Sequence, residues 1–498
     1  MKYYLAFDVG TTAMKAILYD ENFNEVFVSN DEYTLLTPRE CYVELDSEEY
    51  IRGFGRSVKK ISEKGFCMDD IVSVTFTTQG ETLIPIDKNG DALTNAVVWL
   101  DMRAQSEAEH IKNAISEDEF YRHTGLCTID GALPAAKLLW IYNNRRDIYD
   151  KTYKFLLLED FLIYRLTGKT VSNMSLLSST GWFDIFSGAY YDDILDACCI
   201  DREKLTDILK CGKIVGNVTE EAAKQFGLSE KTIVTTGAMD QISSALGAGN
   251  IKEGVVTETT GTALVVGACC KNPNMSAADK ITVYRHFDDS YIYMPFCRAA
   301  GIVLKWFKDN MMSELSAKAA EKGVSTYSLI DRLAEKANAG SGGVICFPYF
   351  AGCDDIENSN GAFFGLTLKT SKAELSRSVL EGIAFMLRDC IEALRRCGVN
   401  VSEIHSLGGG AYSDIWTQIK ASVCDLPVNR HGSGQSTALG AAILGASAVS
   451  GVPAGEITKS ISGASLVYPK KYDAAVYKKA YKNYRALYEL AKNYYGKE

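Results

Sequence analysis

The sequence YYLAFDVGTTAMKAILYD, residues 3–20, gives the first indication of the architecture. An apolar run leads into Asp8, a Gly-Thr-Thr turn follows, and a second apolar run ends at Asp20. This pattern predicts two strands, 3–7 and 16–19, joined by a tight turn. Backbone N–H groups and hydroxyls in such a turn point into one concavity that suits an anion, so the turn is a candidate phosphate site.

A second stretch, VVTETTGTALVVG at residues 255–267, repeats the order of strand, Gly/Thr turn and strand. A single turn of this kind is more often only a tight hairpin, because Gly and Thr are common in turns. Two such turns in one chain, one of them directly after Asp8, favour two phosphate-binding turns that face each other.

The rest of the chain predicts a mixed α/β protein in two halves. Strand-like runs cover 71–77, 82–86, 232–235, 255–258, 263–267 and 404–407, and helical patterns cover 133–143, 320–337, 372–396, 413–423 and 472–495. Because no Pro-rich or Gly/Ser-rich linker separates the halves, we place the boundary at the short turn around Gly249. The expected domains are residues 1–249 and 250–498.

The composition of the chain speaks against several classes of function. The 498 residues are 47% hydrophobic and carry a net charge of −10, which speaks against a nucleic-acid-binding face. No apolar run approaches ~18 residues and the start lacks a signal peptide, so we expect a cytoplasmic protein that does not enter a membrane. The 14 cysteines form no C-x-x-C pair and the five histidines are far apart, so we expect reduced thiols and no zinc site.

The usual nucleotide-binding motifs are missing. TGKT at residues 167–170 is not a P-loop, because Ile163 stands where the first glycine is needed. No G-x-G-x-x-G follows a strand, so a dinucleotide-binding fold is not supported. The three glycines at 408–410 follow a short strand and would let the backbone approach a flat ligand closely.

A carboxylate also begins a predicted helix. In TTGAMDQISSALGAG, residues 235–249, Asp240 follows an apolar strand and opens a helix of small residues. One interpretation is an ordinary N-cap on a tightly packed helix, which the residues alone favour. The other is a base that projects into a cleft between two domains.

At this point the sequence resembles the FGGY carbohydrate kinases, and the resemblance runs nearly from end to end. The stretch GAFFGLTLKTSKAELSRSVLEGI, residues 361–383, fits the second signature of that family. LPAAKLLWIYNN, residues 133–144, resembles the first signature around Lys137 and Trp140, although Ala132 stands where a larger residue or glycine is usual.

The resemblance implies two ribonuclease-H-like domains with an inter-domain cleft, as in actin and hexokinase, and a kinase that transfers the γ-phosphate of ATP to a sugar or polyol. It implies ATP and Mg²⁺ as cofactors, with Asp8 holding the metal and Asp240 as catalytic base. Nucleotide-binding positions are implied at Asp8, Gly10, Thr11, Thr12, Lys15, Gly261, Thr262, Gly301, Lys305, Gly409, Gly410 and Asp414.

The acceptor is less clearly indicated. Glycerol kinases of this family carry Gln-Arg-Glu-Thr where this chain has Gln79-Gly80-Glu81-Thr82, and their glycerol-site tyrosine aligns with Ala132. The missing arginine and tyrosine predict a larger pocket and therefore a pentulose such as xylulose, with glycerol, erythritol and gluconate as alternatives. The expected substrate-binding residues are Gln79, Gly80, Glu81, Trp99, Asp101, Arg103, Asp240 and Gln241.

Some interpretations stay open. Asp101 and Arg103 are equally compatible with a surface salt bridge. Asp354 and Asp355 stand where many members of the family show Glu-Arg-x-Pro, and no role follows for them. Family members often form homodimers, so a homodimer is allowed. The competing class is an actin-like ATPase without sugar transfer, which the intact acidic residue at position 240 speaks against.

Overall fold

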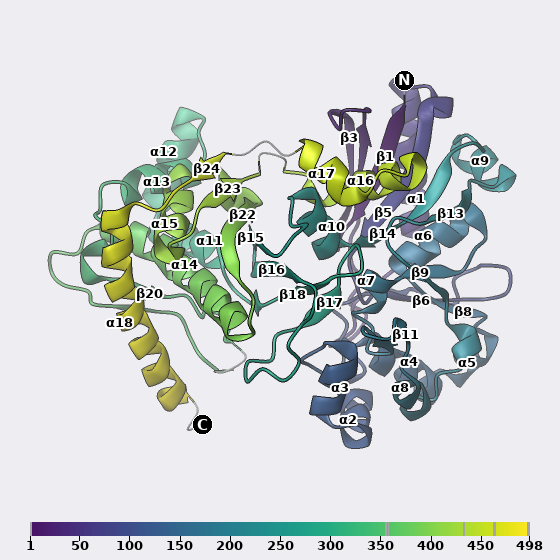
Figure 1. Cartoon of the computed structure of the whole chain (residues 1–498), viewed down its shortest axis with the longest axis horizontal. Coiled ribbons are helices and arrows are strands. Elements are labelled where there is room, and N and C mark those ends of the chain that lie inside the picture. The colour runs from purple at the N-terminus through teal and green to yellow at the C-terminus, as the bar shows by residue number, and fades with distance from the viewer. Residues whose placement is uncertain (1, 354–355, 357, 432–433, 462–464, 496–498) are drawn as a thin grey trace.

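The protein is described by a computed structural model that covers residues 2–353, 356, 358–431, 434–461 and 465–495 (Figure 1). Asp354 and Asp355, for which the sequence indicates no role, lie outside the described residues. Two bodies of sheet and helix stand side by side in Figure 1, with the N-terminal half in purple to teal and most of the C-terminal half in green. No helix among the described residues is long and apolar enough to span a membrane.

The first body is built on a six-stranded sheet in the order β13-β14-β5-β1-β2-β3. β1–β2 and β2–β3 are antiparallel hairpins, whereas β5 and β14 run parallel to β1. The strands are β1 (Tyr3–Val9), β2 (Ala13–Tyr19), β3 (Glu25–Glu32), β5 (Ile71–Thr78), β13 (Ile214–Asn217) and β14 (Ile233–Met239).

The second body repeats this arrangement. Its sheet has the order β17-β18-β16-β15-β22-β23-β24, in which β15–β16 is an antiparallel hairpin and β22 and β23 run parallel to β15. The strands are β15 (Gly254–Thr260), β16 (Leu264–Cys270), β17 (Val283–Arg285), β18 (Tyr291–Tyr293), β19 (Phe296–Cys297), β22 (Val401–Leu407), β23 (Val428–Arg430) and β24 (Leu466–Val467). Three antiparallel strands followed by two parallel ones, twice in one chain, confirm the predicted fold class.

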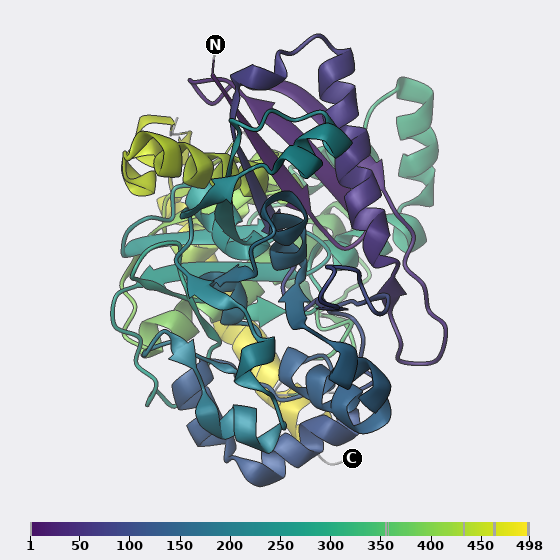
Figure 2. The same cartoon turned by 90° about the vertical axis from the view of Figure 1, so that its right-hand side faces the viewer.

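Helices cover both sheets. Figure 2 shows α1 on one face of the first sheet and α16 on the opposite face. The α-helices are α1 (Ser47–Glu63), α2 (Gln105–Ala114), α3 (Glu117–Thr124), α4 (Pro134–Asn144), α5 (Arg146–Lys151), α6 (Leu158–Thr167), α7 (Met174–Leu177), α8 (Asp192–Ala197), α9 (Glu220–Phe226), α10 (Asp240–Gly247), α11 (Gly301–Met311), α12 (Ser313–Lys322), α13 (Thr326–Ala334), α14 (Lys372–Arg396), α15 (Asp414–Cys424), α16 (Ser436–Ser450), α17 (Ala454–Ile461) and α18 (Lys471–Tyr495).

Smaller elements complete the two bodies. A four-stranded sheet in the order β4-β7-β6-β8 flanks the first body, and short pairs join β10 to β11, β9 to β12 and β20 to β21. Their bounds are β4 (Glu44–Leu45), β6 (Leu83–Ile86), β7 (Ala96–Val97), β8 (Lys154–Leu157), β9 (Val171–Asn173), β10 (Phe183–Asp184), β11 (Ala189–Tyr190), β12 (Asp207–Leu209), β20 (Ile345–Phe347) and β21 (Ala362–Phe364). The 3₁₀ turns are η1 (Met68–Asp70), η2 (Arg202–Lys204), η3 (Ser341–Gly343) and η4 (Gly409–Tyr412).

The structure differs from two sequence predictions of local structure. The first strand does not stop before Asp8 but continues through it to Val9, because Asp8 is paired with neighbours on both sides in the sheet. The single helix predicted at 320–337 is two helices, α12 and α13. Gly323 adopts a left-handed conformation that ends α12, and the Ser325 side chain caps α13.

Helix α16 returns from the C-terminal half to pack on the first sheet, against β1, β5 and β14, and on α10 (Figure 1). Small residues make this contact close. A methyl group on Gly440 would lie 1.9 Å from the Ser243 carbonyl oxygen, and one on Gly247 would lie 2.0 Å from the Ser436 carbonyl oxygen. The chain therefore passes between the two bodies again after β23, and the boundary at residue 249 stays a prediction.

Candidate active site

The first of the two predicted phosphate-binding turns lies between β1 and β2. The Gly10 N–H donates to the Ala13 carbonyl oxygen at 3.0 Å, which closes the turn. Asp8 and Lys15 are directly opposite each other in the hairpin. Burial raises the pKa of Asp8 above its ordinary value, and the Lys15 ammonium acts in the opposite direction. The turn thus places a carboxylate and a cation beside backbone donors.

Two aromatic residues hold the tip of this turn. The Trp99 indole N–H donates to Thr11 Oγ1 at 2.9 Å. The Tyr33 hydroxyl donates to the Gly10 carbonyl oxygen, and the Tyr33 N–H donates to the Thr12 carbonyl oxygen at 3.0 Å. Trp99, expected to contact substrate, therefore supports the turn, while the Thr12 side chain stays exposed.

Asp240 is the first residue of α10 and follows directly on the last residue of β14. Met239 is the N-cap of this helix, so Asp240 is not. Among the described residues, the Asp240 carboxyl accepts only the N–H of the next residue, Gln241, at 2.6 Å. Burial, and secondly the Asp8 carboxylate, raise the pKa of Asp240 to about 7. A carboxyl group with a pKa near neutrality is suited to accept a proton.

Glu81 lies in the same acidic region. Its backbone is left-handed, with φ +66°, a conformation that costs energy for a residue with a side chain. Burial raises the pKa of Glu81, Lys137 acts against this, and Asp130 and Asp240 raise it further. The Lys137 ammonium donates to the carbonyl oxygens of Glu81, at 3.3 Å, and of Val98, at 2.9 Å.

A strand of the second body reaches this region. On β17, the Val283 N–H donates to the Gly125 carbonyl oxygen at 2.8 Å, and the Arg285 N–H donates to Ser178 Oγ at 3.1 Å. Tyr284 stands between these two anchors.

Tyr284 lies near two of the acidic residues. Burial raises the pKa of its phenol, and the carboxylates of Glu81 and Asp240 raise it further. Sequence reasoning missed Tyr284, because no local pattern brings residue 284 to residues 81 and 240.

Gln79, Gly80 and Gln241, which were expected to bind substrate, lie in different environments. A methyl group on Gly80 would lie 3.0 Å from Ser179 Oγ and 3.2 Å from Met239 Sδ. The missing arginine therefore does not open space at this point, because these side chains fill it. Gln79 is buried and its amide donates to the Tyr50 hydroxyl at 3.4 Å. Gln241 lines a cavity of only about 10 Å³ between α10 and the second sheet.

Asp101 and Arg103 form a buried ion pair rather than an exposed one. The Asp101 side chain is fully buried and accepts two hydrogen bonds from the Arg103 guanidinium, at 2.6 and 2.8 Å. The same guanidinium donates to Glu44 at 2.6 Å and stacks 3.9 Å over the Tyr42 ring. Since Val43 N–H also donates to Asp101, both groups are engaged within the protein.

A cavity of about 510 Å³ lies in the second body and is lined by half of the twelve predicted nucleotide residues. It is bounded by the β15–β16 turn, the start of α11, α13 and the start of α15. Six of its lining residues were predicted from the sequence: Gly261, Thr262, Gly301, Lys305, Gly409 and Gly410. The turn that carries Gly261 is closed by an N–H bond to the Ala263 carbonyl oxygen at 3.0 Å.

Among the nucleotide residues predicted in the second body, Asp414 is the one that does not line this cavity. Its side chain is 82% exposed and is paired with Arg430. Its neighbour Ser413 lines the cavity instead, and so does Asp331 from α13. Burial raises the pKa of Asp331, with a hydrogen bond from Ser413 acting in the opposite direction. Asp331 was missed because it belongs to the helix whose bounds were predicted wrongly.

Replacing Gly301 with alanine is expected to weaken nucleotide binding. The new methyl group would lie 2.1 Å from the Gly261 carbonyl oxygen, so the β15–β16 turn must shift. Overpacking of this kind costs about 1–3 kcal/mol, which corresponds to a rise of about tenfold in the KM for ATP. Steady-state kinetics measure this. Gly455→Ala on α17 is the matched control, because nothing lies within 4 Å of its added methyl group; equal KM values in both variants would contradict the assignment.

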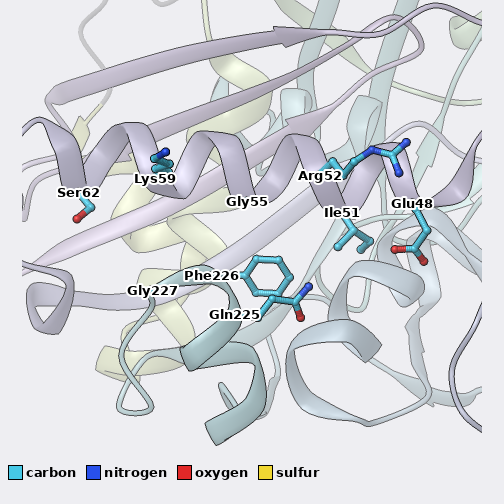
Figure 3. A pocket seen from close by; sticks show the side chains of 9 residues that line it. All are labelled: Glu48, Ile51, Arg52, Gly55, Lys59, Ser62, Gln225, Phe226 and Gly227. Atoms are coloured by element: carbon cyan, nitrogen blue, oxygen red, sulfur yellow. The ribbon is translucent and has the colours of Figure 1, made fainter.

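A further cavity of about 470 Å³ lies on the outer face of the first body, between α1 and α9 (Figure 3). Its lining includes Arg52 and Lys59 from α1 and the ring of Phe226, which points toward α1. None of the predicted site residues lines this cavity. The candidate active site is therefore the region of Asp8 and Asp240 together with the cavity of about 510 Å³ in the second body.

Comparison with known proteins agrees with this geometry. The model of the FGGY family of carbohydrate kinases matches the chain with its N-terminal domain over residues 3–247 and with its C-terminal domain over residues 256–449. A gluconokinase of Bacillus subtilis is 28% identical, over 97% of this chain and 94% of that protein. A xylulose kinase of Staphylococcus epidermidis is also 28% identical, over 98% of this chain and 97% of that protein.

The similar solved structures also include both a xylulose kinase and a gluconate kinase. A ligand-bound xylulose kinase from Lactobacillus acidophilus superposes with a TM-score of 0.90 at 26% identity, covering all of both chains. A gluconate kinase from the same organism superposes with a TM-score of 0.89 at 26% identity, covering 100% of this chain and 99% of that one. The chain belongs to the FGGY family of carbohydrate kinases.

Proposed function

We propose that this carbohydrate kinase transfers the γ-phosphate of ATP to a hydroxyl of an uncharged pentulose such as xylulose, with Asp240 as the catalytic base. The acceptor hydroxyl gives its proton to an Asp240 oxygen as its own oxygen bonds to the γ-phosphorus. The bond from the γ-phosphorus to the β,γ-bridging oxygen breaks, and ADP leaves. Phosphoryl transfer of this kind depends mainly on positioning and on charge stabilisation.

The observation that supports an uncharged acceptor is the acidity of the first-body site. Asp8 acts on the pKa of Asp240, and Asp240 and Asp130 act on that of Glu81, so several carboxyl groups lie near the proposed base. Lys137, the cation that acts on Glu81, is already bonded to two backbone carbonyl oxygens. The carboxylate of gluconate would be repelled here, whereas the hydroxyls of a ketose can donate to these oxygens.

The residues also fit the two groups that the family implies. Mg²⁺ is usually held by one or two carboxylates together with phosphate oxygens and water, and Asp8 supplies a hard oxygen donor beside the phosphate turn. Bound there, Mg²⁺ would neutralise charge on the transferred phosphoryl group. The cavity of about 510 Å³ has room for a nucleoside, and the two Gly/Thr turns would hold the phosphates.

The test is the kcat/KM for a panel of acceptors, measured by phosphorylated product with Mg²⁺-ATP. The panel contains D- and L-xylulose, ribulose, erythritol, glycerol, fructose and gluconate. A pentulose is expected to exceed gluconate by at least about 10²-fold, because a buried like-charge contact costs several kcal/mol. A higher kcat/KM for gluconate would overturn the proposed acceptor, though not the kinase activity.

Replacing Tyr284 with phenylalanine is expected to raise the KM for the acceptor about 5- to 10-fold and to leave the KM for ATP unchanged. The variant loses only a hydroxyl, and a hydrogen bond to substrate is worth about 0.5–1.5 kcal/mol. Tyr291→Phe on the adjacent strand β18 is the control, because its ring packs near Arg285 and Phe186. A rise in both KM values in Tyr284→Phe would contradict a role in acceptor binding.

A further inference from the structure

The strand that carries the proposed base is irregular directly before it. Thr235 and Ala238 are three residues apart on β14, but their partners on β5 are two residues apart, so β14 contains a bulge. Gly237 lies in this bulge and approaches the neighbouring strand so closely that a methyl group on it would be 1.7 Å from the Phe76 carbonyl oxygen. Bulges near active sites redirect the side chains that follow them, here Asp240.

Three buried side chains hold this bulge in place by hydrogen bonds. Glu159 Oε1 accepts the Gly237 N–H at 2.8 Å, and its Oε2 accepts the side-chain amide of Asn173 at 3.0 Å. Asn173 Oδ1 accepts the Ser175 hydroxyl at 2.6 Å. Ser175 Oγ in turn accepts the Met239 N–H at 3.1 Å. We call Glu159, Asn173 and Ser175 the bulge network.

The bulge network is fixed to three different elements and is closed to solvent. Glu159 is on α6, Asn173 ends β9, and Ser175 is on α7, and each side chain is fully buried. Through Glu159 and Ser175, the network accepts hydrogen bonds from the N–H groups of residues 237 and 239. These residues are at the end of β14, just before Asp240. Buried polar chains of this kind make a local conformation unique when every member is satisfied.

We infer that Glu159 is a positioning residue for the phosphoryl-transfer reaction, which holds Asp240 in place through the bulge of β14. This inference rests on the proposed role of Asp240. Glu159 touches neither the nucleotide cavity nor Asp240 itself, so its effect must pass through the Gly237 and Met239 N–H groups. Loosening those two bonds would let the Asp240 carboxyl move relative to the acceptor hydroxyl, and a shift of ~1 Å can cost about 10² in rate.

The donor and acceptor order of the bulge network allows a specific test. In Glu159→Gln the new amide can still accept from Gly237, but its NH₂ group would oppose the NH₂ group of Asn173. In the exchange variant Glu159→Gln/Asn173→Asp, the new amide donates to the new carboxylate, and the bonds to Ser175 and Gly237 are kept. We expect Glu159→Gln to lower kcat about tenfold with the KM for ATP within twofold of wild type, and the exchange variant to recover most of that loss.

Asp160→Asn is the matched control. Asp160 is equally buried on the same helix, and this burial raises its pKa. Its carboxyl accepts the Leu157 N–H, however, and does not bond to β14. Its kcat is expected to stay within twofold of wild type. If the exchange variant melts below the assay temperature, Ser175→Ala provides the second test, because it removes the bond to Met239. It should also lower kcat and leave the KM for ATP unchanged.

The outcomes separate this inference from the proposed function. Wild-type kcat that is retained in both Glu159→Gln and Ser175→Ala would overturn the positioning role while leaving the kinase intact. A fall in the kcat of Glu159→Gln would also overturn it if the KM for ATP worsens equally and the exchange variant does not recover the loss. A general loss of structure would then explain the result. Absence of acceptor-dependent turnover in the wild-type protein would overturn both proposals.

Discussion

Asp240→Asn is expected to lower kcat for the acceptor about 10²- to 10⁴-fold, the usual contribution of a positioned general base. The amide has nearly the same shape as the carboxylate but cannot take the proton of the acceptor hydroxyl. Nucleotide affinity should change little, because Asp240 does not line the nucleotide cavity. Single-turnover kinetics and ADP titration measure the two quantities separately, and a kcat within threefold of wild type would contradict the assignment of the base.

The same variant should be more stable than the wild type at alkaline pH. The folded protein raises the pKa of Asp240 to about 7, above the value of an unfolded aspartate. The stabilisation associated with the neutral form is therefore complete below about pH 4 and is lost as pH rises through 7. Asp240→Asn is neutral at every pH, so its free energy of unfolding should exceed that of wild type by about 1–3 kcal/mol at pH 8. Urea unfolding of the metal-free proteins at pH 5 and pH 8 tests this, and a difference that shrinks toward pH 8 would contradict it.

Asp8→Asn should have the second largest effect, a fall of about 10²-fold or more in kcat/KM for Mg²⁺-ATP. The substitution removes the charge that would hold the metal beside the phosphates, and one preorganised charge of this kind is worth about 10²–10³ in rate. The required Mg²⁺ concentration should rise as well. An Mg²⁺ titration at fixed ATP measures this, with Asp414→Asn as a control because Asp414 is exposed and paired with Arg430. An unchanged half-saturating Mg²⁺ concentration would contradict metal binding by Asp8.

The parts of the fold that depend on short-range patterns could be predicted from the sequence. The two Gly/Thr hairpins follow from alternating apolar residues around a turn, and both were predicted within a few residues of their observed bounds. The long helix α14 was predicted with its observed bounds from its helical pattern, and in the structure Ser371 and Glu374 form a capping box at its start. Gly323 and Ser325 carried an equally local signal for the break between α12 and α13, but the apolar spacing on both sides outweighed it.

The parts of the site that depend on distant segments could not be predicted. Tyr284 and Glu159 reach the region of Asp240 from other elements, and no spacing in the sequence connects them. For Asp101 and Arg103 the sequence left substrate binding and an ion pair equally open, and in the structure Arg103 pairs with both Asp101 and Glu44. A charged residue shows its type in the sequence, but its partner is fixed only by packing.

Phosphorylation of a sugar is tested by ADP release from Mg²⁺-ATP with and without acceptor. We expect a low rate without acceptor and a large increase with one member of the panel, since domain closure on the acceptor would exclude water as a competing nucleophile. That increase should disappear in Asp240→Asn. ADP release at one rate regardless of acceptor, unaffected by Asp240→Asn, would contradict the account and indicate an actin-like ATPase.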